Sequence, residues 1–209
     1  VSFLLLFFVT KGCAKFWPLI ISFLFSVFIF ISRTEVRPEM FSFVILSLFL
    51  FAIFKAKYNK NYCYFLFLPL AQLFWVNLHI YFFIGPFLIL AFLADRIINK
   101  DYSRIKKIIA ILPLTLAATL VNPSGIQGAL LPFKILNEYG YSIVENQTLF
   151  FLADFFSFNL PIFVFKVSVA VLVVSFLLSI KKARQRIFEI LTSVFFLYAG
   201  FKMLRNLPL

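Results

Sequence analysis

Charged residues are scarce in this sequence. Only 13% of the 209 residues are charged, while 63% are hydrophobic. Soluble domains are usually about one-quarter charged and about one-half apolar. One soluble core cannot bury this much apolar sequence, so the composition excludes a single soluble domain. It predicts an integral membrane protein built from several transmembrane segments.

Cysteine and histidine are also rare. Cys13 and Cys63 stand alone, and His79 is the only histidine. There is no CxxC pair and no Cys/His cluster, so neither a disulfide framework nor a metal site is indicated. We expect no metal and no cofactor.

The net charge of +12 is not concentrated in one place. The sequence has no run of five or more basic residues and no RNA-binding motif. A surface that binds nucleic acid needs a basic face. We therefore expect the lipid bilayer, and no nucleic acid, as a partner.

Long hydrophobic runs predict an all-α fold of about seven to eight transmembrane helices. A span needs about 20 apolar residues, and about 17 are tolerated. We expect a partial span at 1–10 and spans near 16–32, 39–54, 62–78, 80–94, 108–121, 160–180 and 187–201.

The connection 122–159 mixes polar and apolar residues and predicts an extracytoplasmic, interfacial loop with a short helix. No internal repeat or low-complexity linker divides the chain, so residues 1–209 are expected to form a single polytopic domain. Hydrophobic segments lie next to both ends, and the first residue is Val1. We interpret the chain as a fragment of a longer protein.

Basic residues predict the orientation of these spans. Alternate connections fall into two sets, which hold fourteen and five of the twenty basic residues, with Lys166 inside a span. Cytoplasmic connections are enriched in lysine and arginine. The first set is therefore expected to face the cytoplasm. We interpret the positive charge of the cytoplasmic set as anchoring. In the outer set acidic and basic residues balance, and we interpret them as paired groups that belong to a functional site.

The first candidate site lies in LFWVNLHIYFF, residues 73–83. In a helix Trp75 and His79 share one face and Asn77 points away. In an extended chain all three point the same way. Polar groups at membrane depth need partners or a wet cavity. The alternative is an interfacial tryptophan, with Asn77 and His79 bonding between helices.

The second candidate lies in SRTEVRPEMF, residues 32–41. Pro38 suits the start of a helix, and Glu39 in the first turn suits its dipole. Arg33 and Arg37 lie on the side where basic residues are few, and the guanidinium group of Arg37 suits bidentate binding of phosphate. The alternative is a pair of weak surface ion pairs with the neighbouring glutamates.

Three more polar positions belong to the same expected outer side. Asn122 precedes a proline and a turn glycine, which first of all predicts the end of a helix. Glu145 lies in the long loop, and Arg205 follows the last span.

These segments occur in an order that resembles a known family. RPEMFSF, QLFWVNLHIYFFIG, NPSG, IVEN and LRNLPL follow one another over roughly residues 30–209. The set resembles the central membrane part of bacterial GT-C type glycosyltransferases, which are related to dolichyl-phosphate-mannose protein mannosyltransferases. The resemblance implies a transferase of the bacterial inner membrane. Such an enzyme moves a sugar from a polyprenyl-phosphate donor to a glycan, lipid or protein acceptor on the outer side.

The resemblance also implies roles for individual residues. Arg37 and Arg205 would bind the donor phosphate. The substrate pocket would be formed by Glu39, Trp75, Asn77, His79, Asn122 and Glu145. The catalytic carboxylate of the family lies in a first outer loop, and we expect this chain to begin after that loop. No catalytic residue is therefore assigned here.

Two positions depart from the family pattern. Ile80 stands where a small residue often follows the histidine, and Asn146 stands where a tryptophan often follows the glutamate.

Three other functions stay open. An O-antigen ligase or polymerase would have an outer loop rich in arginine and histidine, but 122–159 contains one lysine and neither of those residues. A transporter or flippase would carry charges at mid-depth in its spans. A non-catalytic membrane subunit is the third alternative.

Overall fold

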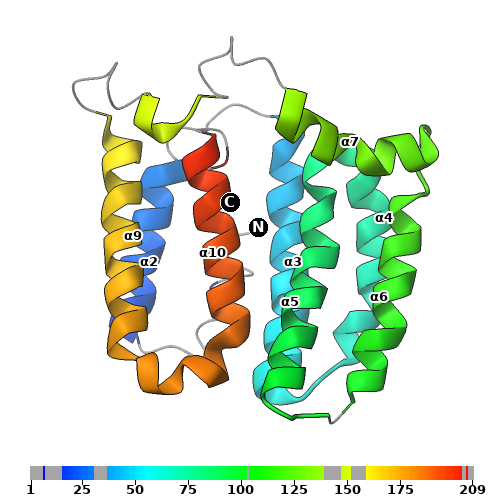
Figure 1. The fold of residues 1–209 in the computed structure, drawn as a ribbon, viewed down its shortest axis with the longest axis horizontal. Helices are drawn as coiled ribbons and strands as arrows, with labels where there is room; N and C mark the ends of the chain where they lie inside the picture. The colour runs from blue at the N-terminus through cyan, green and yellow to red at the C-terminus, as the bar shows by residue number, and fades with distance from the viewer. Residues whose placement is uncertain are drawn as a thin grey trace. The chain divides into compact units, whose positions relative to one another are not determined.

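The computed structural model describes residues 7, 16–30, 37–102, 104–138, 147–151, 159–203 and 206. Across these ranges the protein is all-helical and contains no β-strand. The chain divides into two compact units (Figure 1). Unit 1 comprises the described residues of 1–14 and 36–138, and unit 2 comprises those of 15–35 and 139–209.

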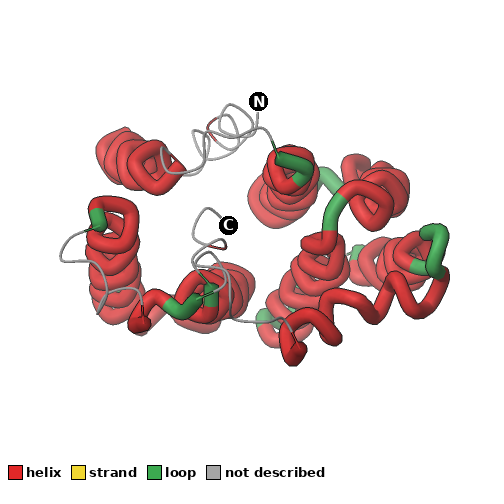
Figure 2. The backbone as a smooth tube through the Cα atoms, turned by 90° about the horizontal axis from the view of Figure 1, so that it is seen from above, coloured by secondary structure: helices red, strands yellow, loops and turns green. Residues whose placement is uncertain are grey.

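In the described part of unit 1, upright helices form a bundle and a further helix lies across one end of it (Figures 1 and 2). Helix α4 packs against α6 and α3, and α5 packs against α6 and α3. The helices are α3 (Glu39–Asn59), α4 (Leu68–Leu78), α5 (Ile84–Ile98), α6 (Ile105–Thr119) and the transverse α7 (Gly125–Glu138). Short 3₁₀ helices precede α4 and α5, namely η1 (Cys63–Phe67) and η2 (Ile80–Phe83).

The described part of unit 2 includes the helices α2 (Phe16–Phe30), α9 (Leu160–Leu178) and α10 (Ile187–Lys202). The 3₁₀ helix η4 (Ile180–Arg186) joins α9 to α10. Helix α2 packs against α9. Their shared core is formed by Ile29, Leu149, Ile162, Val164 and Phe165.

Every span expected from residue 16 onward falls on a helix or on a 3₁₀–α pair. Three of these segments are long and apolar enough to cross a membrane: Glu39–Asn59, Ile80–Ile98 and Leu160–Leu178. Helices α2 and α6 have 15 residues and α10 has 16, which is short for a hydrocarbon layer of about 30 Å. The number of seven to eight spans stays a prediction, and the partial span at 1–10 lies almost wholly outside the described residues.

The helix ends follow the local sequence. Helix α3 begins directly after Pro38 and carries Glu39 in its first turn, as expected. It ends at Lys60, whose φ of 53° is left-handed. Lys100 and Arg104 also have positive φ values, 56° and 59°. All three left-handed basic residues lie in the connections after α3 and between α5 and α6.

A close contact fixes the first turn of α5 in the core. A Cβ atom at Gly85 would collide with Oε1 of Gln72 and lie 3.0 Å from the ring of Phe49. Nε2 of Gln72 donates a hydrogen bond of 2.8 Å to the carbonyl oxygen of Phe82. Within the described part of the chain, Oε1 has no hydrogen-bond partner. Because Gly85 has no side chain, the amide group of Gln72 fits against the first turn of α5.

We predict that Gly85→Ala destabilises the protein, although alanine is the better helix former. Displacing a packed group costs about 1–3 kcal/mol, more than the gain of at most about 1 kcal/mol from helix propensity. Thermal unfolding in detergent measures the change. In a Gln72→Ala background the cost of Gly85→Ala should shrink, and an equal cost in both backgrounds would show that the amide is not its cause.

Candidate functional site

Polar side chains of unit 1 gather at its two ends. The end where α3 begins and α4 and α6 finish is called the α7 end, because α7 lies across it in Figure 1. The opposite end, where α3 and α5 finish, is called the Asp95 end. The connections of this unit thus alternate between two ends, which agrees with the alternation that the distribution of basic residues requires.

A chain of three side chains links α3 to α4 at the α7 end. Nε1 of Trp75 donates to Oγ of Ser42 over 2.9 Å, and Oγ lies 3.0 Å from Nδ1 of His79. Ser42 and Trp75 are both fully buried. The imidazole ring also makes an edge-on contact with Tyr81, with ring centroids 4.5 Å apart. Trp75 on α4 and His79 directly after it therefore both contact the same serine of α3.

The direction of these hydrogen bonds follows from the donors available. The indole N–H of Trp75 can only donate, so Oγ of Ser42 accepts from it. In the described part of the chain, Nδ1 of His79 is the only acceptor within reach of the buried Ser42 proton. Buried polar hydrogens are nearly always bonded. In the tautomer in which Nδ1 of His79 accepts this proton, Nε2 is the nitrogen that carries the hydrogen of the ring.

His79 is also held through its backbone. It follows the last residue of α4, where its φ of −159° and ψ of 151° are extended, and its amide donates to the carbonyl oxygen of Trp75. The chain enters η2 at the next residue. Of the two conformations considered from the sequence, the helical one is correct through Leu78, and the extended one applies to His79 alone.

Arg37 and Glu39 belong to the same end of unit 1. Glu39 opens α3 one turn before Ser42, so the two residues lie on neighbouring positions of one helix face. The carbonyl oxygen of Arg37 accepts a hydrogen bond of 3.0 Å from the amide of Met40. Both residues are half-buried. The α7 end therefore holds Arg37, Glu39, Trp75 and His79 among the predicted site residues.

Asn77 turns away from this cluster and ties α4 to α6. Its Nδ2 atom donates to the carbonyl oxygen of Leu73 over 2.8 Å and to that of Val121 over 2.9 Å. The sequence prediction that Asn77 contributes to a substrate pocket is untested, but its amide nitrogen is used to hold two helices together.

Asn122 forms the turn between α6 and α7. Its Nδ2 atom donates to the carbonyl oxygens of Thr119 and Gly125, and its Oδ1 atom accepts from the amide of Ser124. A Cβ atom at Gly128 would collide with this side chain. The predicted helix end is present here, and the observed contacts of Asn122 are all local.

Two predicted site residues, Glu145 and Arg205, lie outside the described residues. Lys166, which the sequence places inside a span, has an exposed side chain on α9.

The Asp95 end holds the buried ion pairs of unit 1. The Asp95 carboxylate, fully buried, lies 3.2 Å from Nζ of Lys57 and 2.8 Å from Nη2 of Arg96. Nη1 of Arg96 reaches Asp101 over 2.7 Å, and its guanidinium group lies 5.1 Å from the ring centre of Phe92. Asn99 donates to the carbonyl oxygen of Asp95. These contacts join the ends of α3 and α5 to the loop that follows.

This network changes the interpretation of the inner charges. The sequence suggested that basic residues at this end serve only for anchoring and that paired charge lies on the outer side. Lys57 and Arg96 are instead bonded to carboxylates inside the bundle. The physical reason is that burying a carboxylate among apolar side chains is costly unless opposite charges pair with it.

Sequence reasoning missed Ser42, Gln72, Lys57 and Asp95. The available signal was a polar side chain inside an otherwise apolar helix, which must find a partner. The partners lie far along the chain: Ser42 and Trp75 are 33 residues apart, and Lys57 and Asp95 are 38 apart. In the described ranges, no group of three or more His, Cys, Asp or Glu residues is placed to hold a metal ion.

Replacement of Ser42 should destabilise the protein, because it leaves the buried indole N–H of Trp75 without a hydrogen-bond acceptor. We expect Ser42→Ala to lower the free energy of unfolding by about 1–3 kcal/mol. Ser47→Ala is the matched control, since Ser47 is a buried serine on the same helix that bonds only to the carbonyl oxygen of Val44. Chemical unfolding in detergent compares the two variants, and equal losses would contradict a special role for Ser42.

Neutralising Asp95 should have a larger effect. Asp95→Asn leaves Lys57 and Arg96 without their charge partner, and breaking a buried pair costs about 3–5 kcal/mol. Asp101→Asn removes a carboxylate that is 34% exposed, so we expect a loss of about 1 kcal/mol or less. The same unfolding measurement compares the two variants. A larger loss of stability from Asp101→Asn than from Asp95→Asn would rule out Asp95 as the centre of the network.

Comparison with known proteins gives no relative on which to rest a function. No protein-family model, no curated protein and no solved structure matches this chain. The candidate site therefore rests on its geometry and on the resemblance of its sequence motifs.

Proposed function

We propose that the chain is the central membrane part of a GT-C type glycosyltransferase of the bacterial inner membrane. In this proposal the seven to eight helices all cross the bilayer, and the Asp95 end of unit 1 faces the cytoplasm. The α7 end faces outward and borders the site where a polyprenyl-phosphate sugar is bound. The acceptor is a glycan, a lipid or a protein on that side.

The observation that carries the proposal is the Trp75–Ser42–His79 chain at the end of unit 1 where Arg37 and Glu39 begin α3. It holds the ring of the only histidine in the sequence against Ser42 and, in the tautomer in which Nδ1 accepts, leaves Nε2 as the donor. A ring fixed by both side-chain and backbone contacts is suited to donate a hydrogen bond in a defined direction. Trp75 is fully buried, so its part in this proposal is to position His79 rather than to contact the sugar.

The chemistry of the reaction fits these groups. When the sugar leaves its carrier, negative charge develops on the phosphate, and a nearby cation stabilises it. The guanidinium group of Arg37 stays protonated at any physiological pH and presents several donors in one plane. Nε2 of His79 would donate to the phosphate or to a sugar hydroxyl. The carboxylate that activates the acceptor hydroxyl is expected elsewhere in the enzyme.

Helix α7 supports the assignment of the α7 end to a membrane surface. It lies across the ends of the upright helices (Figure 1) and exposes large apolar side chains. A helix of this kind can lie in the interface between lipid headgroups and acyl chains. Those exposed side chains are Ile126, Leu130, Leu131 and Phe133.

A non-catalytic membrane subunit is the second candidate. It is favoured by the observation that Ser42, Trp75 and Asn77 direct their observed hydrogen bonds to other groups of unit 1. In this case the cluster at the α7 end serves only to hold the bundle together.

The double variant Arg37→Ala/His79→Ala distinguishes the two candidates. Loss of a charge-stabilising donor lowers the rate of such reactions by about 100-fold or more. Sugar transfer from a radiolabelled polyprenyl-phosphate sugar is measured in membranes that contain the full-length protein. We expect transfer to fall by at least that factor in a protein that still folds, with an unfolding temperature lowered because buried Ser42 loses its His79 partner.

Lys106→Ala is the control, because this exposed lysine lies at the opposite end of unit 1. It should leave transfer unchanged. Undiminished transfer by a folded double variant would exclude Arg37 and His79 from the donor site and leave the subunit as the better interpretation.

A further inference from the structure

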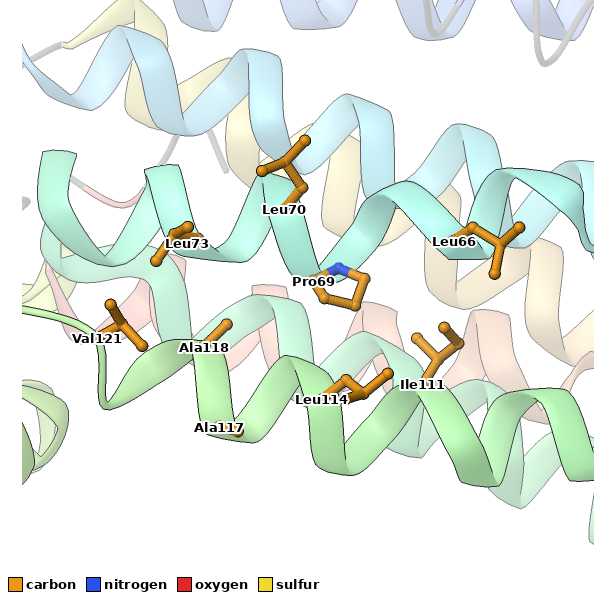
Figure 3. A pocket seen from close by; sticks show the side chains of 9 residues that line it. All are labelled: Leu66, Pro69, Leu70, Leu73, Ile111, Leu114, Ala117, Ala118 and Val121. Carbon is orange, nitrogen blue, oxygen red and sulfur yellow. The ribbon is translucent and has the colours of Figure 1, made fainter.

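Helices α4 and α6 enclose an open, apolar groove of about 520 Å³ on unit 1 (Figure 3). One wall is formed by 66–73 of η1 and α4, and the other by 111–121 of α6. Small side chains, Ala117 and Ala118, line part of the α6 wall. All nine lining residues are apolar, so the groove offers hydrocarbon contacts and no side-chain hydrogen bonds.

The groove is bridged at the α7 end. Asn77 lies one turn beyond the lining residue Leu73, and its side chain donates to the carbonyl oxygen of Val121 on the opposite wall. This hydrogen bond joins the two walls where α4 and α6 finish. A long apolar occupant therefore has its polar end toward the opposite, Asp95 end.

Lys107 lies next to the groove at the Asp95 end. The α6 lining residues Ile111, Leu114, Ala118 and Val121 follow spacings of three and four, which place them on one helical stripe. Lys107 is four residues before Ile111 and lies on the same stripe, one turn closer to the Asp95 end. It is exposed, and none of the described carboxylates forms an ion pair with it. Arg104, also exposed, directly precedes α6.

These features define the chemistry of the occupant. The wall from Ile111 on α6 to Val121 just after it advances by ten residue steps, or about 15 Å at the rise of a helix, which is half of a hydrocarbon layer of about 30 Å. An acyl chain from one leaflet has this reach. The exposed cation of Lys107 at the open end favours an anionic headgroup over a neutral one.

We propose that the α4/α6 groove binds an anionic phospholipid of the leaflet at the Asp95 end. One acyl chain lies along the groove, and the headgroup phosphate is held by Lys107 and Arg104. This inference rests on the location of unit 1 in a membrane and is independent of sugar transfer, because the groove opens toward the end of unit 1 opposite His79.

Native mass spectrometry of the full chain in detergent tests the proposal with phosphatidylglycerol and, in parallel, phosphatidylcholine of the same acyl chains. We expect tighter binding of phosphatidylglycerol. Lys107→Gln should weaken it about fivefold, the effect of removing one cation near a charged headgroup, and should leave phosphatidylcholine unchanged. Ala118→Phe should weaken both lipids, because its ring fills the groove.

Two variants of α6 serve as matched controls. Lys106→Gln removes the same charge about 100° further round the helix, and Leu116→Phe adds a ring at an exposed position outside the groove. Both should bind phosphatidylglycerol like the unmodified protein, and inorganic phosphate should not displace the lipid.

Several results would overturn the proposal. Equal losses of phosphatidylglycerol affinity from Lys107→Gln and Lys106→Gln would mean that the protein attracts anions in general. Unchanged lipid binding by Ala118→Phe would show that the lipid does not lie in the groove. A change of oligomeric state caused by Ala118→Phe, with lipid binding intact, would show that a helix of a second copy occupies it. Displacement by inorganic phosphate would exclude a role for the acyl chain.

Discussion

The need to pair buried charged and hydroxyl groups governs the architecture of unit 1. A carboxylate or hydroxyl group among apolar side chains loses its bonds to water, and this loss is large unless other protein groups replace them. Asp95 meets this need with Lys57 and Arg96, and Ser42 meets it with Trp75 and His79. The first set joins the end of α3 to α5, and the second joins the start of α3 to α4. The two ends of α3 are therefore fixed by different kinds of polar contact.

Local features of the sequence predicted local structure well. Hydrophobic runs located the helices, Pro38 marked the start of α3, and Asn122 marked the end of α6. The helical reading of LFWVNLH holds as far as Leu78, whereas His79 is extended. Each of these features depends on residues within a turn or two of one another, which a single sequence displays directly.

The contacts that assemble the candidate site depend on positions distant in the sequence, and a single sequence does not show them. Nothing near Ser42 indicates that Trp75 will donate to it, and nothing near Lys57 indicates Asp95 as its partner. The division of the helices into two units is likewise a matter of packing between distant segments. The sequence also could not show that Trp75 is fully buried, and this burial changes its proposed role from contact with the sugar to support of the histidine.

Among the described residues of unit 1, three that are not glycine have a left-handed backbone, and all three are basic. Lys60, Lys100 and Arg104 have left-handed backbone conformations. Glycine adopts such a conformation without steric strain, whereas any other residue destabilises the fold there by about 1 kcal/mol. A cation at each of these bends carries the orientation signal that glycine would lack. On the proposed topology, these cytoplasmic turns lower the stability of the folded protein, but their basic residues favour insertion with the Asp95 end in the cytoplasm.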